Sequence, residues 1–597
     1  MFYNILRYRQ LEHNQLAHRT PLPPKPTYDY IVVGSGSAGA IVSCRLSEWG
    51  SDVLLLEAGG GTDALYDDTP ILGLYFLGQH YQSYRFFQVE PQPYTGQSYF
   101  GGEYQIHSNV LGGGSTVNGM VYNRGNRKFF DTLSTKYGAI GWDYASVLPV
   151  FKLMENNTDP RVSDEYHGRQ GPVGVSTAIK QIPLYEKQAQ AAREWGHQSN
   201  DFNGHNQTGF TVAQSTIARG LRSSTLNAYL KSGLCPRLTI VTGAQVSKIL
   251  IDHDDDDGDN NNGIPRANGV TFIKYNHTYH VWAKREIIVS AGPILSPQLL
   301  MLSGIGPVDH LNDKGITRIY VDLPGVGSNY RDHVNVVLEF PVHNYQPGLI
   351  NPSSLTLDTD NLGQSPYTLF YLSTRNNPDR DDYPDVYLFS EIALNGTQPP
   401  VSAYKPSDIQ SPLYQQFVDY IGELESNEFF QVRTTLVRAM SSGTVRLNTS
   451  RIEDQPLIDP RFLTAEIDRL RLREAVVETF RFVETTSFGQ YVRLPRVPMP
   501  PCQYCPDGRP VYQCLSYIDC LIREWAANQF HPMGTCRMGD PSHRDTVVDP
   551  RLRVKGIRGL RIVDSSVYPE IVNANPNAAA MLVGEMGARF IREDNAN

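Results

Sequence analysis

The stretch DYIVVGSGSAGAIVSCRLSEWGSDVLLLEAGG, residues 29–60, decides the fold class. Its apolar run 30–33 is typical of a buried parallel strand. The glycines that follow have the spacing GxGxxG: Gly34 permits a tight turn, Gly36 lets the backbone approach a pyrophosphate, and Gly39 lets the next helix pack against the strand. The start of that helix offers free N–H groups and the positive end of its dipole to phosphates. The stretch therefore predicts a strand–helix–strand unit that binds a dinucleotide.

An acidic residue completes the unit. A second apolar run, 53–56, ends at Glu57, which lies 23 residues after Gly34. In dinucleotide-binding units an acid at this distance meets the hydroxyls of the adenosine ribose. Strand, helix, strand and acid in this order distinguish the unit from a glycine-rich turn of another kind. NAD and FAD both fit at this point.

Length and charge bound the remaining possibilities. The chain has 597 residues, which is too long for one hydrophobic core, so at least two domains are expected. A formal charge of −9 provides no basic field for nucleic acid. No apolar run is long enough for a membrane span. The first 20 residues are too polar for a signal peptide, so the protein is either cytosolic or a secreted form that lacks its signal peptide.

The cysteines favour secretion. Four of them cluster, at Cys502, Cys505, Cys514 and Cys520, while Cys44, Cys235 and Cys536 stand apart. The cluster fits two local disulfides or a four-thiolate zinc site, and the five-residue gap before Cys520 is longer than the CxxC pairs of zinc ribbons. We therefore expect disulfides, in a connectivity that the sequence leaves open, and no metal site.

Glycosylation signals point the same way. Five Asn-x-Ser/Thr sequons occur, at Asn156, Asn206, Asn276, Asn395 and Asn448. Together with the cysteine cluster they predict a secreted glycoprotein.

Hydrophobic patterns outline the rest of the chain. Residues 1–27 predict a surface arm, and the aromatic segment 61–107 an excursion with little periodicity. Strands are expected within 238–290 and at 336–340, 366–372, 385–389 and 435–438, and helices at 183–195 and 465–485. The acidic tract 253–263 fails the EF-hand register, because Ile264 would hold the twelfth position, and predicts a solvated hairpin tip.

A second glycine-rich stretch, NVLGGGSTVNGMVYNRG at 109–125, can lie flat against a large ligand. It is followed along the chain by GPILSPQLLMLSGIG (292–306), LPGVGSNYRDHV (323–334), HPMGTCRMG (531–539) and the tract 548–585. In this order the stretches resemble the glucose–methanol–choline (GMC) oxidoreductase family of FAD flavoproteins, and the chain is most similar to arthropod-type members.

The resemblance implies an α/β fold with two domains. A Rossmann-like FAD-binding domain of GMC type would comprise 28–190, 236–335 and 521–597. An α+β substrate-binding domain, 191–235 with 336–520, would be built on a large mixed or antiparallel sheet that roofs the flavin.

The resemblance also assigns cofactor contacts. The expected residues are Gly34, Ser35, Gly36, Ser37, Ala38, Gly39, Glu57, Ala58, Gly113, Ser115, Asn118, Gly119, Met120, Val121, Val246, Ala291, Asp564, Asn575 and Pro576. Some family members tether FAD through a histidine in the second glycine-rich loop, where this chain has Val117. We therefore expect FAD to be bound non-covalently.

Two residues carry the expected reaction. His531 matches the catalytic histidine of the family, which implies that it removes the hydroxyl proton of an alcohol while hydride leaves for flavin N5. Asn575 stands where family members have histidine or asparagine and would orient the substrate oxygen. We interpret Asp332 and His333 as structural residues or contacts of the FAD domain rather than catalytic residues, and Cys536 as a small buried hydrophobe.

The expected function is oxidation of a CH–OH group, with a sugar, a sterol, an aromatic alcohol or a cyanohydrin as candidate substrate. The electron acceptor would be O2 or a quinone-like carrier. The alternative is a cyanohydrin lyase of the same family, which keeps FAD without redox turnover. An inactive secreted carrier is disfavoured by the intact His531, Asn575 and glycine-rich loop.

Overall fold

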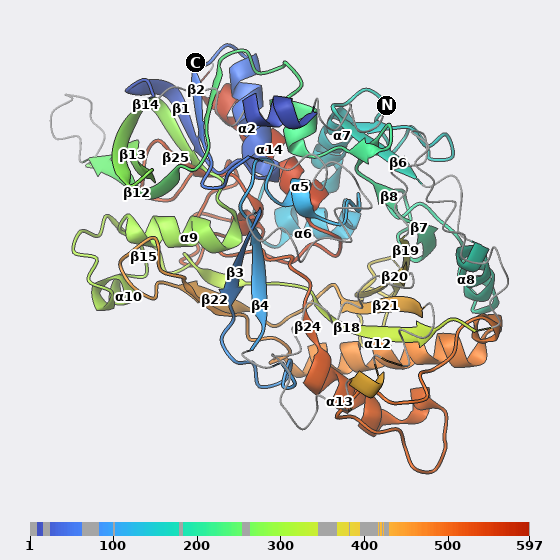
Figure 1. Ribbon diagram of the computed structural model, residues 1–597. Helices are drawn as coiled ribbons and strands as arrows, with labels where there is room; N and C mark the ends of the chain where they lie inside the picture. The colour runs from blue at the N-terminus through green and yellow to red at the C-terminus, as the bar shows by residue number, and fades with distance from the viewer. Residues whose placement is uncertain are drawn as a thin grey trace.

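The structure is a computed structural model that describes residues 9–15, 24–61, 83–99, 102–177, 183–252, 263–343, 367–380, 382–393, 416, 418–420, 422 and 429–595. One sheet has the strand order β11-β2-β1-β14-β13-β12, and β25 also pairs with β14 (Figure 1). Its parallel part consists of β1 (Thr27–Val33), β2 (Val53–Leu56), β11 (Leu238–Val241), β25 (Leu560–Ile562) and the end of β14 (His277–Val289). The antiparallel part adds β12 (Gln245–Asp252) and β13 (Arg266–Lys274).

The long strand β14 joins the two parts of this sheet. Its first half pairs antiparallel with β13, and its second half pairs parallel with β1 and β25. The strands expected within 238–290 are therefore present, and β14 runs without a break through the second half of that range. The acidic tract 253–262 between β12 and β13 lies outside the described residues.

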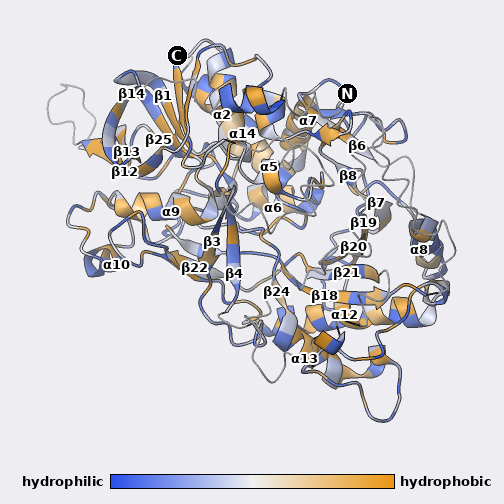
Figure 2. Cartoon of the chain, in the orientation of Figure 1, coloured by the Kyte–Doolittle hydropathy of each residue, from blue (hydrophilic) through white to orange (hydrophobic). Residues whose placement is uncertain are grey.

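Two helices cover the parallel strands. α2 (Ser37–Glu48) follows β1, and α14 (Asn577–Asp594) packs beside it (Figure 1). Glycines make this packing close: a Cβ at Gly39 would lie 2.0 Å from the oxygen of Gly34, and one at Gly584 would lie 2.7 Å from the oxygen of Ala38. β1 and β2 beneath them are almost entirely buried. The hydropathy colours show their apolar character (Figure 2). The expected Rossmann-like unit is therefore present.

A second, antiparallel sheet has the order β24-β18-β21-β20-β19-β7. Its strands are β24 (Ala527–Asn528), β18 (Val334–Pro341), β21 (Phe429–Leu436), β20 (Val386–Ala393), β19 (Thr368–Leu372) and β7 (Gly209–Val212). One face packs on α8 (Pro183–Glu194), α12 (Glu466–Thr485) and α13 (Leu515–Trp525). β18, β19, β20, α8 and α12 confirm the elements expected at 336–340, 366–372, 385–389, 183–195 and 465–485. The strand expected at 435–438 overlaps only the end of β21, which begins at Phe429. The assigned domain boundaries stay a prediction.

The opposite face of this sheet carries a separate aromatic cluster. Tyr367, Leu369 and Tyr371 alternate along one strand with residues of the other face, and Tyr387 and Phe389 do so on the next. This alternation is the normal consequence of side chains pointing to opposite sides of a strand. We call this side the roof face.

The remaining elements are shorter. They are β3 (Tyr84–Gln88), β4 (Tyr104–Ser108), α5 (Gly114–Val117), α6 (Arg127–Thr135), α7 (Tyr144–Met154), β5 (Glu155–Asn157), β6 (Val173–Thr177), β8 (Gln214–Ser215), β9 (Ile217–Ala218), β10 (Leu221–Arg222), α9 (Gly292–Leu302), β15 (Ile305–Gly306), α10 (Val308–Asp313), β16 (Val321–Asp322), β17 (Ser328–Tyr330), β22 (Gly443–Arg446) and β23 (Leu457–Asp459). The hairpin β3–β4 lies in the segment 61–107, for which the sequence predicted little regular structure. In the N-terminal arm, residues 9–15 are helical and His13 is buried.

Three disulfides cross-link the described part of the chain. Cys502–Cys520 and Cys505–Cys514 confirm the expected local pairs. Cys44 and Cys235, which stand apart in the sequence, are also paired, with their Cα atoms 4.9 Å apart. The pairing escaped prediction because 191 residues separate the two cysteines, and only the fold brings them together. In the described residues, no group of side chains is arranged to hold a metal ion, and no helix has the length and apolar character of a membrane span.

Candidate active site

The first glycine-rich loop has the expected geometry. Gly34 has a φ of +97°, and a Cβ there would lie 2.4 Å from the oxygen of Ser290. A Cβ at Gly36 would meet no atom within 4 Å, so the backbone is open on that side. Ser37 and Ala38 form the first turn of α2, which exposes its N–H groups to the same space.

Glu57 lies directly beside this loop. Its carboxylate oxygen Oε2 accepts hydrogen bonds from the backbone N–H and the hydroxyl of Ser35, at 2.8 and 2.6 Å. Its backbone oxygen accepts the N–H of Ala244, at 2.8 Å, which sets the start of β12 next to Glu57 and Ala58. Val246 lies two residues further along that chain segment. The acid, the loop and the strand are therefore brought together.

The second glycine-rich loop packs on the first. Gly113 has a φ of +53°, and a Cβ there would lie 2.5 Å from Cα of Gly36. Ser115 is turned inward, since its hydroxyl donates to the oxygen of Gly112 at 2.7 Å and lies 2.9 Å from the hydroxyl of Thr225. This hydroxyl therefore braces the loop.

The end of this loop is held in an unusual backbone conformation. Met120 has a φ of +64°, and its N–H donates to Oδ1 of Asn118 at 2.9 Å. A guanidinium N–H of Arg222 donates to the backbone oxygen of Asn118 at 2.7 Å. Gly119 lies between them, where a Cβ would be 3.9 Å from the hydroxyl of Tyr367, and Val121 joins the roof-face cluster. The loop thus reaches the second sheet.

Two helix N-termini meet at the first loop. The hydroxyl of Ser37 donates to Oδ1 of Asn577 at 2.8 Å, and Pro576 caps the start of α14. The positive dipole ends of both helices therefore face one region, which suits an anionic group.

A third helix start lies nearby. The N–H of Gly292, next to Ala291, donates to Asp564 at 2.9 Å, and the hydroxyl of Ser296 does so at 2.6 Å. Burial raises the pKa of Asp564 above its usual value. The C-terminal tract is therefore joined to the residues that follow β14.

His531 is half-buried and pairs with His333, which is fully buried. Its Nδ1 is 2.9 Å from Nδ1 of His333, and Nε2 of His333 is 2.9 Å from the backbone oxygen of Val572. Burial lowers the pKa of His333 to about 4, and burial together with the neighbouring His333 holds the pKa of His531 well below its usual value. Both rings are therefore neutral at neutral pH.

The hydrogen-bond chain fixes the tautomer of His531. A carbonyl oxygen only accepts, so Nε2 of His333 carries the proton and its Nδ1 offers a lone pair. His531 must then donate through Nδ1–H. Its Nε2 is left without a proton, which is the state that a general base requires.

Asn575 and Tyr387 lie close to this pair. The ring of Tyr387 is 6.3 Å from that of His333, and its hydroxyl donates to Oε1 of Gln529 at 2.8 Å. Asn575 also interacts with the Tyr387 hydroxyl. Among the described residues, Oδ1 of Asn575 is buried without a hydrogen-bond partner, so it is free to bind a ligand.

Two buried carboxyl groups hold the chain that leads to His531. Asp332 accepts the backbone N–H of His531 at 2.9 Å, and Glu103 accepts both the backbone N–H and the side-chain amide of Asn528, the latter at 2.9 Å. Burial raises the pKa of Asp332 to about 7 and that of Glu103 to about 8. The segment from Asn528 to His531 is thereby anchored at both ends.

The family model described as GMC oxidoreductase matches the chain at residues 28–335 in its N-terminal part and 439–584 in its C-terminal part. The chain is a GMC oxidoreductase. Glucose dehydrogenase [FAD, quinone] of Drosophila melanogaster is 33% identical over 583 residues, which cover 95% of this chain and 87% of that one. Oxygen-dependent choline dehydrogenase of Brucella canis is 32% identical, over 94% and 95% of the two chains. These relatives support an FAD-dependent enzyme that carries out oxidation of the alcohol type.

Solved structures show the same fold. Formate oxidase of Aspergillus oryzae superposes with a TM-score of 0.78 at 23% identity, over 96% of this chain and 99% of that one. Pyridoxine 4-oxidase, with a TM-score of 0.74 at 24% identity, covers 94% and 98% of the two chains. At this level of identity the likeness concerns the fold alone.

The residues of this GMC oxidoreductase fit FAD. The open side of Gly36, the paired helix N-termini and the carboxylate of Glu57 suit the pyrophosphate and the ribose. In the described part of the chain, the buried hydroxyl of Ser290, beside Gly34, and Oδ1 of Asn575 have no hydrogen-bond partner, and a bound ligand would satisfy them.

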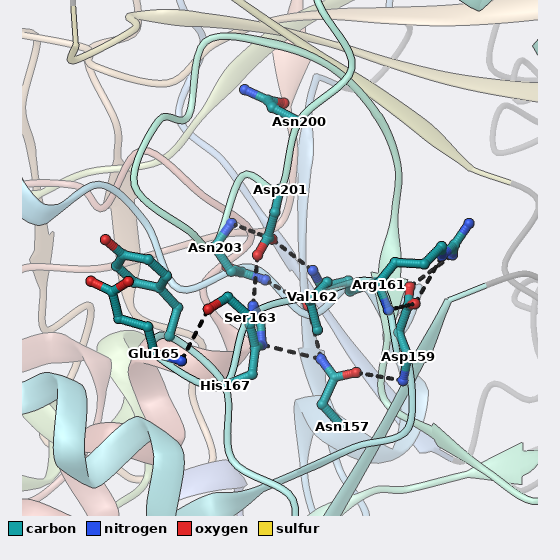
Figure 3. Close-up of polar contacts among 12 residues, drawn as sticks. Asn157, Asp159, Arg161, Val162, Ser163, Glu165, His167, Asn200, Asp201 and Asn203 are labelled. Atoms are coloured by element: carbon teal, nitrogen blue, oxygen red, sulfur yellow. Dashed lines mark hydrogen bonds and ion pairs between the residues drawn. The ribbon is translucent and has the colours of Figure 1, made fainter.

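A cluster of polar residues surrounds His167 (Figure 3). The ring nitrogens of His167 lie 2.7 Å from carboxylate oxygens of Glu155 and Asp201. Next to them, Asn203 accepts the N–H of Arg124 at 2.8 Å and donates to the oxygen of Tyr122 at 3.0 Å. The cluster therefore fixes the backbone at the end of the loop.

Sequence reasoning missed three contributors to the site. His333 was interpreted as structural, although it contacts the candidate base directly. Glu103 and Tyr387 lie outside the motifs, and no local pattern distinguishes them. For His333 the sequence did contain a signal, because it lies next to β18 within a stretch that resembles the family. Cys536 is free and buried, as expected.

Proposed function

We propose that this enzyme oxidises the CH–OH group of a small-molecule alcohol with His531 as the general base. The observation that carries the proposal is the hydrogen bond from Nδ1–H of His531 to Nδ1 of His333, because it leaves the lone pair of Nε2 available. A neutral, half-buried imidazole next to the reacting hydroxyl can take its proton near neutral pH. Asn575 holds the substrate oxygen through its amide, which cannot act as a base itself.

FAD supplies the hydride acceptor when it is bound. The contact residues predicted from the sequence would hold it, with Ser35 and Glu57 near the ribose and the N-termini of α2 and α14 near the pyrophosphate. We propose that the protein binds FAD non-covalently, since Val117 offers no nucleophile at the position of the tethering histidine. Acid precipitation tests this: colour that stays in the pellet would contradict it.

The electron acceptor that we propose is O2 or a quinone-like carrier. The name of one relative, glucose dehydrogenase, includes quinone, and the name of another, choline dehydrogenase, includes oxygen-dependent. Peroxide formation compared with reduction of a quinone-like dye, measured on the same preparation, separates the two acceptors.

The decisive experiment is His531→Ala in the FAD-loaded enzyme. We expect the flavin content to be retained and kcat to fall by roughly 10²- to 10⁴-fold, the usual loss for a general base. His543→Ala, on an exposed loop, is the matched control and should leave kcat unchanged. Normal turnover of His531→Ala would refute the assignment. If substrate is consumed anaerobically while the flavin keeps its visible absorbance, the enzyme is the cyanohydrin lyase instead.

We propose that the protein is secreted and glycosylated. The three disulfides fit an oxidising compartment, and the sequon asparagines Asn206, Asn276 and Asn448 are exposed. Treatment of protein from a secretory host with an N-glycosidase should increase its mobility. An unchanged mobility would contradict glycosylation.

A further inference from the structure

The roof face brings charged residues close to the catalytic residues. The strand register places Asn335, Thr435 and Tyr387 in one row across β18, β21 and β20. The next row on the same face consists of Val337, Arg433 and Phe389, and the third contains Glu391. Successive rows on one face are about 7 Å apart.

The first row belongs to the catalytic site. The amide of Asn335 donates to the oxygen of Asn528 at 3.1 Å, and Tyr387 donates to Gln529. Both partners lie in the segment that ends at His531. The second row therefore lies about 7 Å from groups that contact the catalytic segment.

The second and third rows contain an ion pair. Nη2 of Arg433 lies 3.0 Å from Oε1 of Glu391, and the two side chains are 30% and 23% exposed. Neighbouring Leu369 is fully buried and Phe389 is 8% exposed. Val337, in the same row, is also partly exposed. The charged groups that are accessible in this region of the face are therefore those of the ion pair.

The same pair lies near the second glycine-rich loop. Tyr367, whose hydroxyl would be 3.9 Å from a Cβ at Gly119, has a pKa that burial and then the charge of Glu391 hold above its usual value. Arg433 acts electrostatically on both Tyr367 and Tyr387. The pair thus lies between the loop that we assign to the flavin and the catalytic row.

The chemistry of the pair selects among alcohols. Arg433 makes one side-chain hydrogen bond within the described residues, so further guanidinium N–H groups can donate to a ligand. Glu391 can only accept. A hydroxyl group donates and accepts, so it can bind both partners at once. Arg433 and Glu391 together carry no net charge, so a cationic group binds well only if it displaces Arg433 from Glu391, and a carboxylate only if it displaces Glu391 from Arg433.

We infer that Arg433 and Glu391 are specificity-determining residues, which favour neutral alcohols with a second hydroxyl about one sheet row from the reacting carbon. This inference rests on the proposed function, because it assumes that the reacting hydroxyl lies at His531 and Asn575. It assigns the enzyme to neutral diols and sugars rather than to cationic alcohols such as choline.

Matched substrates test the inference in the holoenzyme. We compare kcat/KM for 1,5-pentanediol with that for 1-pentanol, which differ only in the distal hydroxyl, and include choline and a hydroxycarboxylate. The kcat/KM of the wild-type enzyme should be about tenfold higher for the diol, because one good hydrogen bond contributes about that factor. Arg433→Met and Glu391→Met should each reduce that ratio towards one.

The two variants also predict opposite changes. Arg433→Met leaves the Glu391 carboxylate uncompensated and should improve choline relative to the diol, whereas Glu391→Met should improve the hydroxycarboxylate. Arg473→Met, which removes the exposed ion pair with Asp519 between α12 and α13, is the matched control and should leave all ratios unchanged. Flavin content confirms that each variant is folded.

The outcomes distinguish failure of this inference from failure of the proposed function. If alcohols reduce the flavin but the ratios are equal in wild type and variants, Arg433 and Glu391 only stabilise the sheet, and this inference is wrong. If no alcohol reduces the flavin of the wild-type enzyme, the proposed function fails and the inference fails with it.

Discussion

The Nδ1 atom of His333 lies 2.9 Å from Nδ1 of His531, and its Nε2 lies 2.9 Å from the oxygen of Val572. The carbonyl oxygen thus sets the tautomer of one ring, and that ring sets the tautomer of the other. Both rings are neutral, so each carries one ring proton, and the proton position on His333 decides which nitrogen of His531 carries the other. His333 is therefore a positioning residue for the base.

Replacement of His333 should lower kcat while FAD stays bound. In His333→Ala nothing accepts from Nδ1–H of His531, so the tautomer with the proton on Nε2 becomes populated and kcat should fall about 10-fold or more. His333→Asn offers an amide oxygen as acceptor and should recover part of the loss. Stopped-flow measurement of flavin reduction checks this, and equal rates in both variants and wild type would remove His333 from the mechanism.

The pH dependence of kcat/KM should reflect the low pKa of His531. Burial, followed by the charge of His333, lowers this pKa, and the base is active in its neutral form, which predominates above the pKa. The rate should therefore stay constant as the pH falls from 8 to about 6.5, the ordinary pKa of histidine, and decline only below it. In His333→Asn the acid limb should move to higher pH, because one lowering cause is removed. If kcat/KM of the wild-type enzyme already declined above pH 7, the pKa of the base would not be lowered as we expect.

Glu103 should be protonated in the folded protein near neutral pH. Burial raises its pKa to about 8, above its unfolded value, so the folded state holds the proton more tightly and stability falls as the pH rises from about 4.5 to about 8. Glu103→Gln keeps a neutral acceptor for Asn528 and lacks this cost. Its Tm should therefore exceed that of the wild type by a margin that grows from pH 5 to pH 8.

Two further variants separate the charge of Glu103 from its hydrogen bonds. Glu103→Leu removes the acceptor of the backbone N–H of Asn528 and of one N–H of its side-chain amide, so kcat should fall about 10-fold while Glu103→Gln keeps it near the wild-type value. Glu90→Gln, on the exposed side of the same chain segment, is the control and should show no pH-dependent margin in Tm. A margin that is constant with pH in Glu103→Gln would show that Glu103 is already ionised.

The parts of the site that are local in sequence could be predicted. Gly34 and Gly39 act within one strand–helix unit, so their spacing alone specifies the turn and the close packing. Glu57 follows from the length of the same unit. His531 and Asn575 were assigned by resemblance, because no spacing distinguishes a catalytic histidine from a structural one.

The contacts between distant segments could not be predicted. Glu103 reaches Asn528 across 425 residues, and Arg433 meets Glu391 only because two strands pair in a particular register. The sequence pattern identified these strands, since alternation and apolar runs are local signals. Their order in the sheet depends on the tertiary fold, which decides which polar residues share a face.

The disulfides predict the thiol count of protein from an oxidising secretory host. With Cys44–Cys235, Cys502–Cys520 and Cys505–Cys514 formed, only Cys536 should react with a thiol reagent, and only after denaturation, because it is buried. Reduction should release all 7 cysteines. Loss of the long-range pair in Cys44→Ser/Cys235→Ser should cost about 2–4 kcal/mol of stability, since it frees the loop between α2 and β11 in the unfolded chain. Cys536→Ser is the control for thiol chemistry and should leave no reactive group. Three reactive thiols in the denatured wild-type protein would show that Cys44 and Cys235 are not paired.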